Sequence, residues 1–157
     1  MAGTLDKFPD LRILLAHSGG TIPFLAGRLD SCVAHDPTVQ TRLQHEPSWY
    51  LKKLYYDGVG YHAPALKLAR ELVGADRIMF GYLHFTSPSV SWQGRGIVWM
   101  GWTDFRTDNP FFPPLMGDKG DAWESVRTNV TAAKMAFNED ECDGVMGLNA
   151  IKILDLH

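Results

Sequence analysis

The sequence is poor in cysteine, with only Cys32 and Cys142 among its 157 residues. The two lie far apart and form no CxxC pair, which excludes a disulfide-dense scaffold and a CxxC redox or metal motif. We interpret both as free thiols in a reducing compartment, with a disulfide between them as the alternative.

Long apolar runs are also absent. No window approaches the length of a membrane span. The N-terminal run ILLA is too short for a signal peptide, and charges at Lys7, Asp10 and Arg12 precede it. We therefore expect a cytoplasmic protein with no membrane partner.

Neither sign of charge dominates. Lys plus Arg is 15 and Asp plus Glu is 18, which gives a formal net charge of -3. The sequence has no basic run, and its tryptophans do not alternate with basic residues as they would along a nucleic-acid groove. We expect no nucleic-acid partner. The 45% hydrophobic content is that of an ordinary globular domain with a real core.

What the chain does contain is a repeated strand–helix pattern. Residues 11–17, LRILLAH, form a continuous apolar run that predicts a strand covered on both faces. The glycine turn SGG follows, and then Ile22, Leu25 and Leu29 recur at helical spacing after a predicted N-cap at Thr21.

The same pattern returns further along the chain. A strand is predicted to end near Asp57, a helix to run from 63 to a C-cap at Gly74, and a third buried strand to cover 77–81. An amphipathic helix is predicted around 123–137, and a short terminal helix over 147–156. This order predicts parallel βα units. Three strands are few for a complete α/β domain, and a (β/α)8 barrel typically needs about 250 residues.

Polar groups at the carboxyl ends of the predicted strands are the candidate functional residues. His17 closes the first strand before a Ser-Gly-Gly turn, where an imidazole could act as acid, base or metal ligand. A histidine bonded to a neighbouring carbonyl for packing is an equally weighted interpretation. For Asp57, capping of the next loop is favoured over catalysis. His35 and Asp36, beyond the first helix, are interpreted as a surface turn, and His45, His62 and His157 have no partner at metal-ligand spacing.

Five motifs in order carry a resemblance to a known family: AHSGG, PFLAGR, YYD, GADRIMFG and GLNA. Together they resemble the C-terminal half of the amidohydrolase-related, aminocarboxymuconate-semialdehyde decarboxylase-like family. The resemblance implies that residues 1–157 are one partial domain of a (β/α)8 TIM barrel, holding strands 6 to 8 and the helices that follow them. It also implies a metal-dependent enzyme, usually with zinc, that decarboxylates an aromatic or unsaturated carboxylate.

The resemblance assigns roles to individual residues. His17 matches the family's catalytic histidine, which activates a metal-bound water. Arg28 matches an arginine that reaches into the neighbouring subunit and binds the substrate carboxylate, a role that suits the guanidinium fork. A homodimer of the full-length enzyme is therefore implied as well.

The chain departs from the family at its metal ligands. It has no HxH motif, and where the family has Gly-Ser/Thr-Asp after the last strand it has Gly81-Tyr82-Leu83. The sequence TDNPFFPP at 107–114 restores the pattern and makes Asp108 the metal ligand if residues 82–106 are an irregular insertion. The reading frame and the codons available at its boundaries permit residues 82–106 to be the translation of a retained intron, which is the interpretation we favour. The alternative is a genuine lid insertion.

The sequence thus predicts a metal-dependent decarboxylase that is inactive as this chain alone, because His17 and Asp108 are too few ligands for zinc. A hydrolase of the same superfamily, which opens a lactone or amide with metal-bound water, is the alternative. A third hypothesis is a non-catalytic half-barrel, which either pairs with a full-length homologue through the helix that carries Arg28 or is a truncated product that misfolds.

Overall fold

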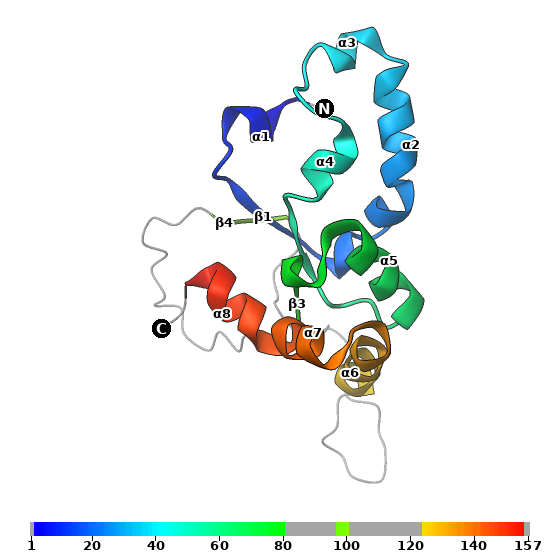
Figure 1. Cartoon of the computed structure of the whole chain (residues 1–157), viewed down its shortest axis with the longest axis vertical. Coiled ribbons are helices and arrows are strands. Elements are labelled where there is room, and N and C mark those ends of the chain that lie inside the picture. Colours follow the sequence, from blue (N-terminus) through cyan, green and yellow to red (C-terminus); the bar gives the residue numbers. More distant parts are fainter. Residues whose placement is uncertain (1, 81–96, 101–123, 156–157) are drawn as a thin grey trace.

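The computed structural model describes residues 2–80, 97–100 and 124–155 (Figure 1). Within these ranges the strands are β1 (Arg12–Leu15), β2 (Tyr55–Asp57), β3 (Ile78–Met79) and β4 (Ile97–Met100). They form one parallel sheet in the order β3-β2-β1-β4. The sheet therefore places β1 between β2 and β4, the last of the described strands.

Helices and helical turns surround this sheet. The longer helices are α2 (Ile22–Ala34), α5 (Ala63–Val73) and α6 (Glu124–Ala136). The shorter elements are α1 (Thr4–Lys7), η1 (His17–Gly19), α3 (Pro37–Gln40), α4 (Pro47–Leu51), η2 (Ala75–Arg77), α7 (Glu139–Asp143), η3 (Gly144–Leu148) and α8 (Asn149–Leu154). Figure 1 shows α6, α7 and α8 following one another along one side, with α5 beside α6.

Side chains alternate between two apolar clusters, one on each face of the sheet. Tyr56 and Ile78 are partners in the register of β2 and β3, and both are fully buried in the cluster formed with α5 and α6. Leu14 and Met79 belong to the second cluster, with Ala150 and Ile153 of α8. Successive strand residues point to opposite faces, so both faces are covered, as the continuous apolar runs predicted.

Asn149, the first residue of α8, ties the C-terminal helices to the third strand. Its Nδ2 donates to the carbonyls of Ala75 and Ile78, each at 2.8 Å. Arg12 of β1 also donates through Nη1 to the carbonyl of Ile153 at 2.6 Å. The GLNA motif therefore has a structural role, because its asparagine fastens α8 to the sheet.

The parallel α/β arrangement is confirmed, and helices are found in each region where the sequence predicted one. Cys32 and Cys142 are free thiols, as expected. None of the described helices is long and apolar enough to cross a membrane.

The expectation of three strands, with an irregular segment at 82–106, is wrong in part. Residues 97–100 of that segment form β4, which pairs with β1 along all four of its residues, from Arg12↔Ile97 to Leu15↔Met100. The physical reason is local: Ile-Val-Trp-Met is an apolar run rich in β-formers, and the edge of β1 offers unpaired backbone groups. The rest of the segment lies outside the described residues.

Candidate functional site

The candidate site begins where β1 ends, at a turn with unusual backbone geometry. Four residues in a row have positive φ: His17 (55°), Ser18 (52°), Gly19 (76°) and Gly20 (59°). Glycine adopts this region without a steric penalty, whereas other residues do so at about 1–2 kcal/mol each. The first half of the turn is therefore strained and needs compensating interactions.

Asp57 supplies these interactions from the end of the neighbouring strand. Its Oδ2 accepts a hydrogen bond from the His17 N–H at 2.9 Å, and its Oδ1 accepts from the Ser18 N–H at 2.8 Å. The Ser18 hydroxyl also donates to the Asp57 carbonyl at 3.1 Å. Hydrogen bonds to a charged group contribute about 1.5–3 kcal/mol, which is enough to offset the strain.

The Asp57 carboxylate also accepts a hydrogen bond from the loop that follows β2. Oδ1 of Asp57 accepts from the Val59 N–H at 3.1 Å, an Asx-type turn that agrees with the predicted loop-capping role. Asp57 is only 7% exposed. Burial raises the pKa of its carboxyl, and the N–H groups of Ser18, His17 and Val59 oppose that rise by stabilising the charged form.

The side chain of His17 is exposed at the carboxyl end of β1. His17 follows β1 closely and Asp57 is the last residue of β2, so the two residues lie at the carboxyl ends of neighbouring parallel strands. The His17 backbone N–H donates to Asp57, and the charge of the His17 side chain adds a smaller Coulombic interaction that also lowers the pKa of the Asp57 carboxyl. The geometry leaves the imidazole available for chemistry.

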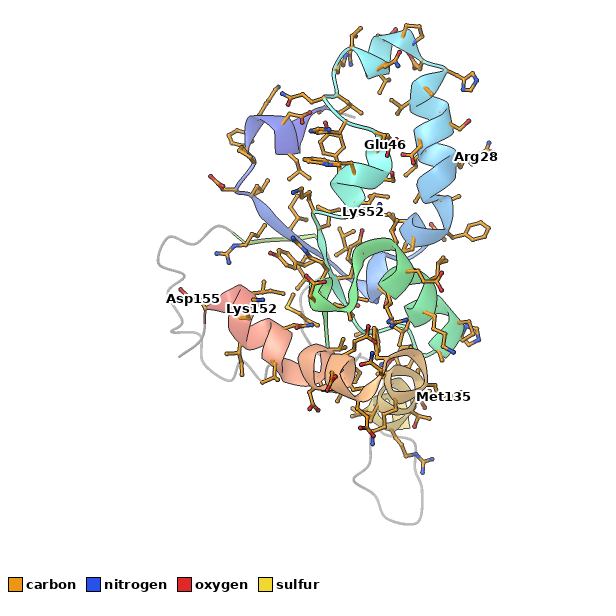
Figure 2. All side chains as sticks on the ribbon, in the orientation of Figure 1. Arg28, Glu46, Lys52, Met135, Lys152 and Asp155 are labelled. Atoms are coloured by element: carbon orange, nitrogen blue, oxygen red, sulfur yellow. The ribbon has the colours of Figure 1, made fainter. Side chains whose placement is uncertain are left out.

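Arg28 does not join this group. It is an exposed residue of α2, and in Figure 2 its side chain points outward, away from the sheet. Phe24 precedes it by one helical turn and is 77% exposed. Arg28 and Phe24 therefore form an outward face of α2 that is suited to contact with another molecule rather than with His17 of the same chain.

Asp108, the predicted metal ligand, lies outside the described residues. Among the residues that the structure does describe, no group of three or more His, Cys, Asp or Glu side chains could hold a metal ion. The two oxygens of Asp57 already accept three backbone N–H groups, which occupy most of the about four lone-pair positions of a carboxylate. The described residues do not by themselves fit a metal site.

Sequence reasoning missed a second loop anchor beside the candidate site. Asn129 of α6 is fully buried, and its Oδ1 accepts from the Tyr61 N–H at 2.8 Å, which fixes the loop between β2 and α5. Tyr61 has a φ of 50°, another strained position. The detectable signal was a polar residue within the apolar stripe that runs from Val126 to Phe137.

An open cleft of about 650 Å³ lies between the start of α5 and α6, lined in part by His62, Thr128 and Thr131. It contains neither His17 nor Arg28. The predicted site residues are therefore not gathered in this cleft.

Among curated relatives, the chain is 28% identical over 87 residues to the 2-amino-3-carboxymuconate-6-semialdehyde decarboxylase of Dictyostelium discoideum, a match covering 50% of this chain and 22% of the relative. It is also 28% identical over 76 residues to a 2-keto-4-carboxy-3-hexenedioate hydratase of Sphingobium sp., covering 47% of this chain and 20% of that one. The matches thus span about a fifth of the length of these relatives.

Among solved structures, the chain matches the apo form of IDCase from Metarhizium anisopliae with a TM-score of 0.75 and 38% identity, over 98% of this chain and 36% of that one. A dihydroxybenzoic acid decarboxylase from Polaromonas sp., solved with bound manganese and an inhibitor, matches with a TM-score of 0.64 and 19% identity, over 99% and 37% of the two chains. The second likeness shows the fold alone.

A family model described as amidohydrolase matches residues 1–156, which is nearly the whole chain. This match and the named relatives agree with the resemblance carried by the five sequence motifs. The chain therefore belongs to the amidohydrolase family, and its relatives in that family include decarboxylases.

Proposed function

We propose that the chain is part of a divalent-metal-dependent decarboxylase that acts on a carboxylated aromatic or muconate-semialdehyde-like small molecule. The observation that carries this proposal is His17, exposed at the carboxyl end of β1 on a turn held in a strained conformation. Strain of this kind persists where surrounding structure compensates it, and it clusters at functional sites. The family match and the decarboxylase relatives support the reaction class.

In this proposal β1, β2 and β3 are strands 6, 7 and 8 of a (β/α)8 barrel. Their parallel order, with a helix after each of the first two, supports the assignment. In such barrels the reaction takes place at the carboxyl ends of the strands, where His17 lies. Since the chain covers 36% of the length of IDCase, the remaining strands would come from sequence outside this chain, and strand 5 would take the edge of β1 that β4 occupies here.

Each predicted residue has its own role. His17 serves as the acid–base group that moves a proton at the reacting carbon. Asp108 is a metal ligand whose partners come from outside this chain, and a bound divalent metal would supply electrophilic stabilisation of the substrate. Arg28 pairs with a substrate carboxylate in the site of a neighbouring subunit, which fits its outward position on α2.

Release of CO2 tests the reaction class. The chain, and any longer reading frame continuous with it, is incubated with Mn²⁺ or Zn²⁺ and with 2-amino-3-carboxymuconate-6-semialdehyde or 2,6-dihydroxybenzoate. We expect CO2 from a longer product that carries an HxH motif and none from the 157-residue chain alone. His17→Ala should reduce the rate by about 10²–10⁴-fold, whereas His35→Ala, an exposed histidine beyond α2, should not.

Addition of water is the second candidate reaction, favoured by the hydratase relative. It is distinguished by the same incubation, because water addition consumes an unsaturated substrate without releasing CO2. Hydrolysis of a lactone would likewise release no CO2. If the longer product consumes substrate by either route, decarboxylation is wrong for this protein. A longer product that leaves every substrate unchanged favours the non-catalytic half-barrel.

A further inference from the structure

The hydrogen bonds of Asp57 are directed at the two positions in the turn where glycine is absent. Gly19 donates its N–H to the Ala16 carbonyl and Gly20 donates to the His17 carbonyl, at 3.0 and 2.7 Å. His17 and Ser18 instead donate to the Asp57 carboxylate. The Asp57 carboxylate therefore binds His17 and Ser18, the two non-glycine residues of the turn, for which the left-handed conformation is strained.

A loop-capping role alone does not explain this arrangement. For the loop after β2, the bond from the Val59 N–H would be sufficient. The bonds from His17 and Ser18 join residues 40 and 39 positions apart and cross from one strand end to the next. The Ser18 hydroxyl adds a third link between the same two strand ends.

Direct participation in chemistry does not explain it either. Asp57 is 7% exposed, and three backbone N–H groups occupy most of the about four lone-pair positions of its carboxylate, so burial and these bonds leave it little access to a substrate or a cation. The consequence of its contacts lies at His17, whose backbone it fixes while the imidazole stays exposed.

We propose that Asp57 is the positioning residue for His17: its buried carboxylate holds residues 17 and 18 in the left-handed conformation in which the His17 side chain is exposed beyond the carboxyl end of β1. The catalytic consequence of this role rests on the proposed function, whereas the conformational consequence does not. Ser18 takes part as the second anchor, through both its N–H and its hydroxyl.

Amide hydrogen exchange in the intact chain tests the conformational part. Asp57→Asn keeps the size of the side chain but replaces one acceptor oxygen with an NH₂ group that faces backbone donors. We expect exchange at the His17 and Ser18 amides to accelerate by about ten-fold or more, while the amides in the middle of α5 change by less than about three-fold. Adding Ser18→Gly to Asp57→Asn should restore the His17 amide part of the way toward its original rate, because glycine adopts the left-handed region without strain but also lacks the hydroxyl that donates to the Asp57 carbonyl.

Unchanged protection at residues 17 and 18 in Asp57→Asn, or an acceleration that is equal at α5, would overturn the proposal. If Asp57→Asn does not fold alone, the double variant with Ser18→Gly decides the question. A folded double variant with the His17 amide protected supports a role through the turn; a double variant that also fails to fold indicates a general core role and contradicts it.

Kinetics separate the positioning role from the proposed function. In a preparation that releases CO2, Asp57→Asn should lower kcat by about 10–100-fold with KM within about three-fold, and Ser18→Gly should recover much of that loss. A change confined to KM would contradict positioning of His17. If the unaltered protein releases no CO2, the proposed function fails, and the exchange measurement still decides whether Asp57 sets the position of His17.

Discussion

A Cβ atom on Gly19 would lie 2.6 Å from Cε1 of Tyr56, closer than real Cβ atoms approach another heavy atom. Packing and a hydrogen bond fix the tyrosine ring, because Tyr56 is fully buried and its hydroxyl donates to the Leu51 carbonyl at 3.0 Å. The first glycine of the AHSGG motif is thus required by the packing of the second strand as well as by its own φ of 76°.

Gly19→Ala should therefore destabilise the chain by about 2–4 kcal/mol, since it combines a clash in the core with a strained backbone. Urea unfolding followed by circular dichroism measures this change. Gly27→Ala is the matched control: a Cβ there meets nothing within 4 Å, and alanine within helix α2 should stabilise by about 0.5–1 kcal/mol. A Gly19→Ala variant as stable as the original would show that the ring of Tyr56 moves aside.

The parallel strands and the main helices were predictable because their apolar patterns are local. β1, α2 and α5 each follow from a run or a stripe within a dozen residues. The presence of glycines indicated a turn after β1, but the left-handed conformation of His17 and Ser18 carries no local signal. It depends on Asp57, forty positions away, and only the folded sheet brings these residues together.

β4 was not predictable for a different reason. Its four residues form a strand only where the edge of β1 is available, and the departure from the family pattern at Gly81 favours an irregular segment at 82–106. Of the predicted site residues, His17 lies just after β1, where the sequence predicted it, Arg28 lies on the outer face of α2, and Asp108 lies outside the described residues; the roles of all three stay predictions.

Asn149→Ala should lower the free energy of unfolding by about 1–3 kcal/mol. The substitution leaves the carbonyls of Ala75 and Ile78 without the donor that now satisfies both, and it frees the start of α8 from β3. Thermal unfolding by calorimetry measures the effect. Lys152→Ala, on the exposed side of the same helix, should change the stability by less than about 0.5 kcal/mol. Equal effects of the two substitutions would contradict the anchoring role.

Acid should weaken the contact between α5 and α7. Glu141 accepts from Nε of Arg70 at 2.9 and 3.0 Å and from the Asn138 N–H at 3.0 Å. Arg70 in the first place, and then the Asn138 N–H, hold the pKa of the Glu141 carboxyl below its ordinary value near 4.5. A carboxyl group with a lowered pKa stabilises the folded chain at pH values above its ordinary pKa. This stabilisation is lost as the pH falls through the lowered pKa.

The expected result is a urea midpoint that falls as the pH drops below about 4.5, with a smaller fall in Glu141→Gln. The Asp76→Asn variant is the control, because Asp76 is largely exposed and lies at 4.0 Å from Arg77. If Glu141→Gln and the original chain lose stability in parallel, the pH dependence arises elsewhere.

Self-association should depend on the outward face of α2. Phe24 is 77% exposed and lies one turn from Arg28, the residue proposed to reach a neighbouring subunit. Phe24→Ser should weaken dimer formation in sedimentation equilibrium by about ten-fold or more, since a large aromatic side chain buried at an interface contributes about 2 kcal/mol or more. Met135→Ser is the control, because Met135 is 64% exposed but belongs to α6 (Figure 2). A stronger effect of Met135→Ser would locate the interface on α6 instead.

The origin of residues 82–106 leads to a prediction for both the message and the protein. We expect mature transcripts to lack these codons, which joins Gly81 to Thr107 and restores the family pattern around Asp108.

In the isolated chain the same deletion removes β4 and leaves the edge of β1 unpaired along all four of its residues. Exchange at the amides of β1 should therefore accelerate, and the melting temperature should fall, when the chain lacks this segment. Transcripts that retain the codons throughout would favour a lid insertion. A shortened chain with unchanged exchange at β1 would show that β4 contributes nothing to the sheet.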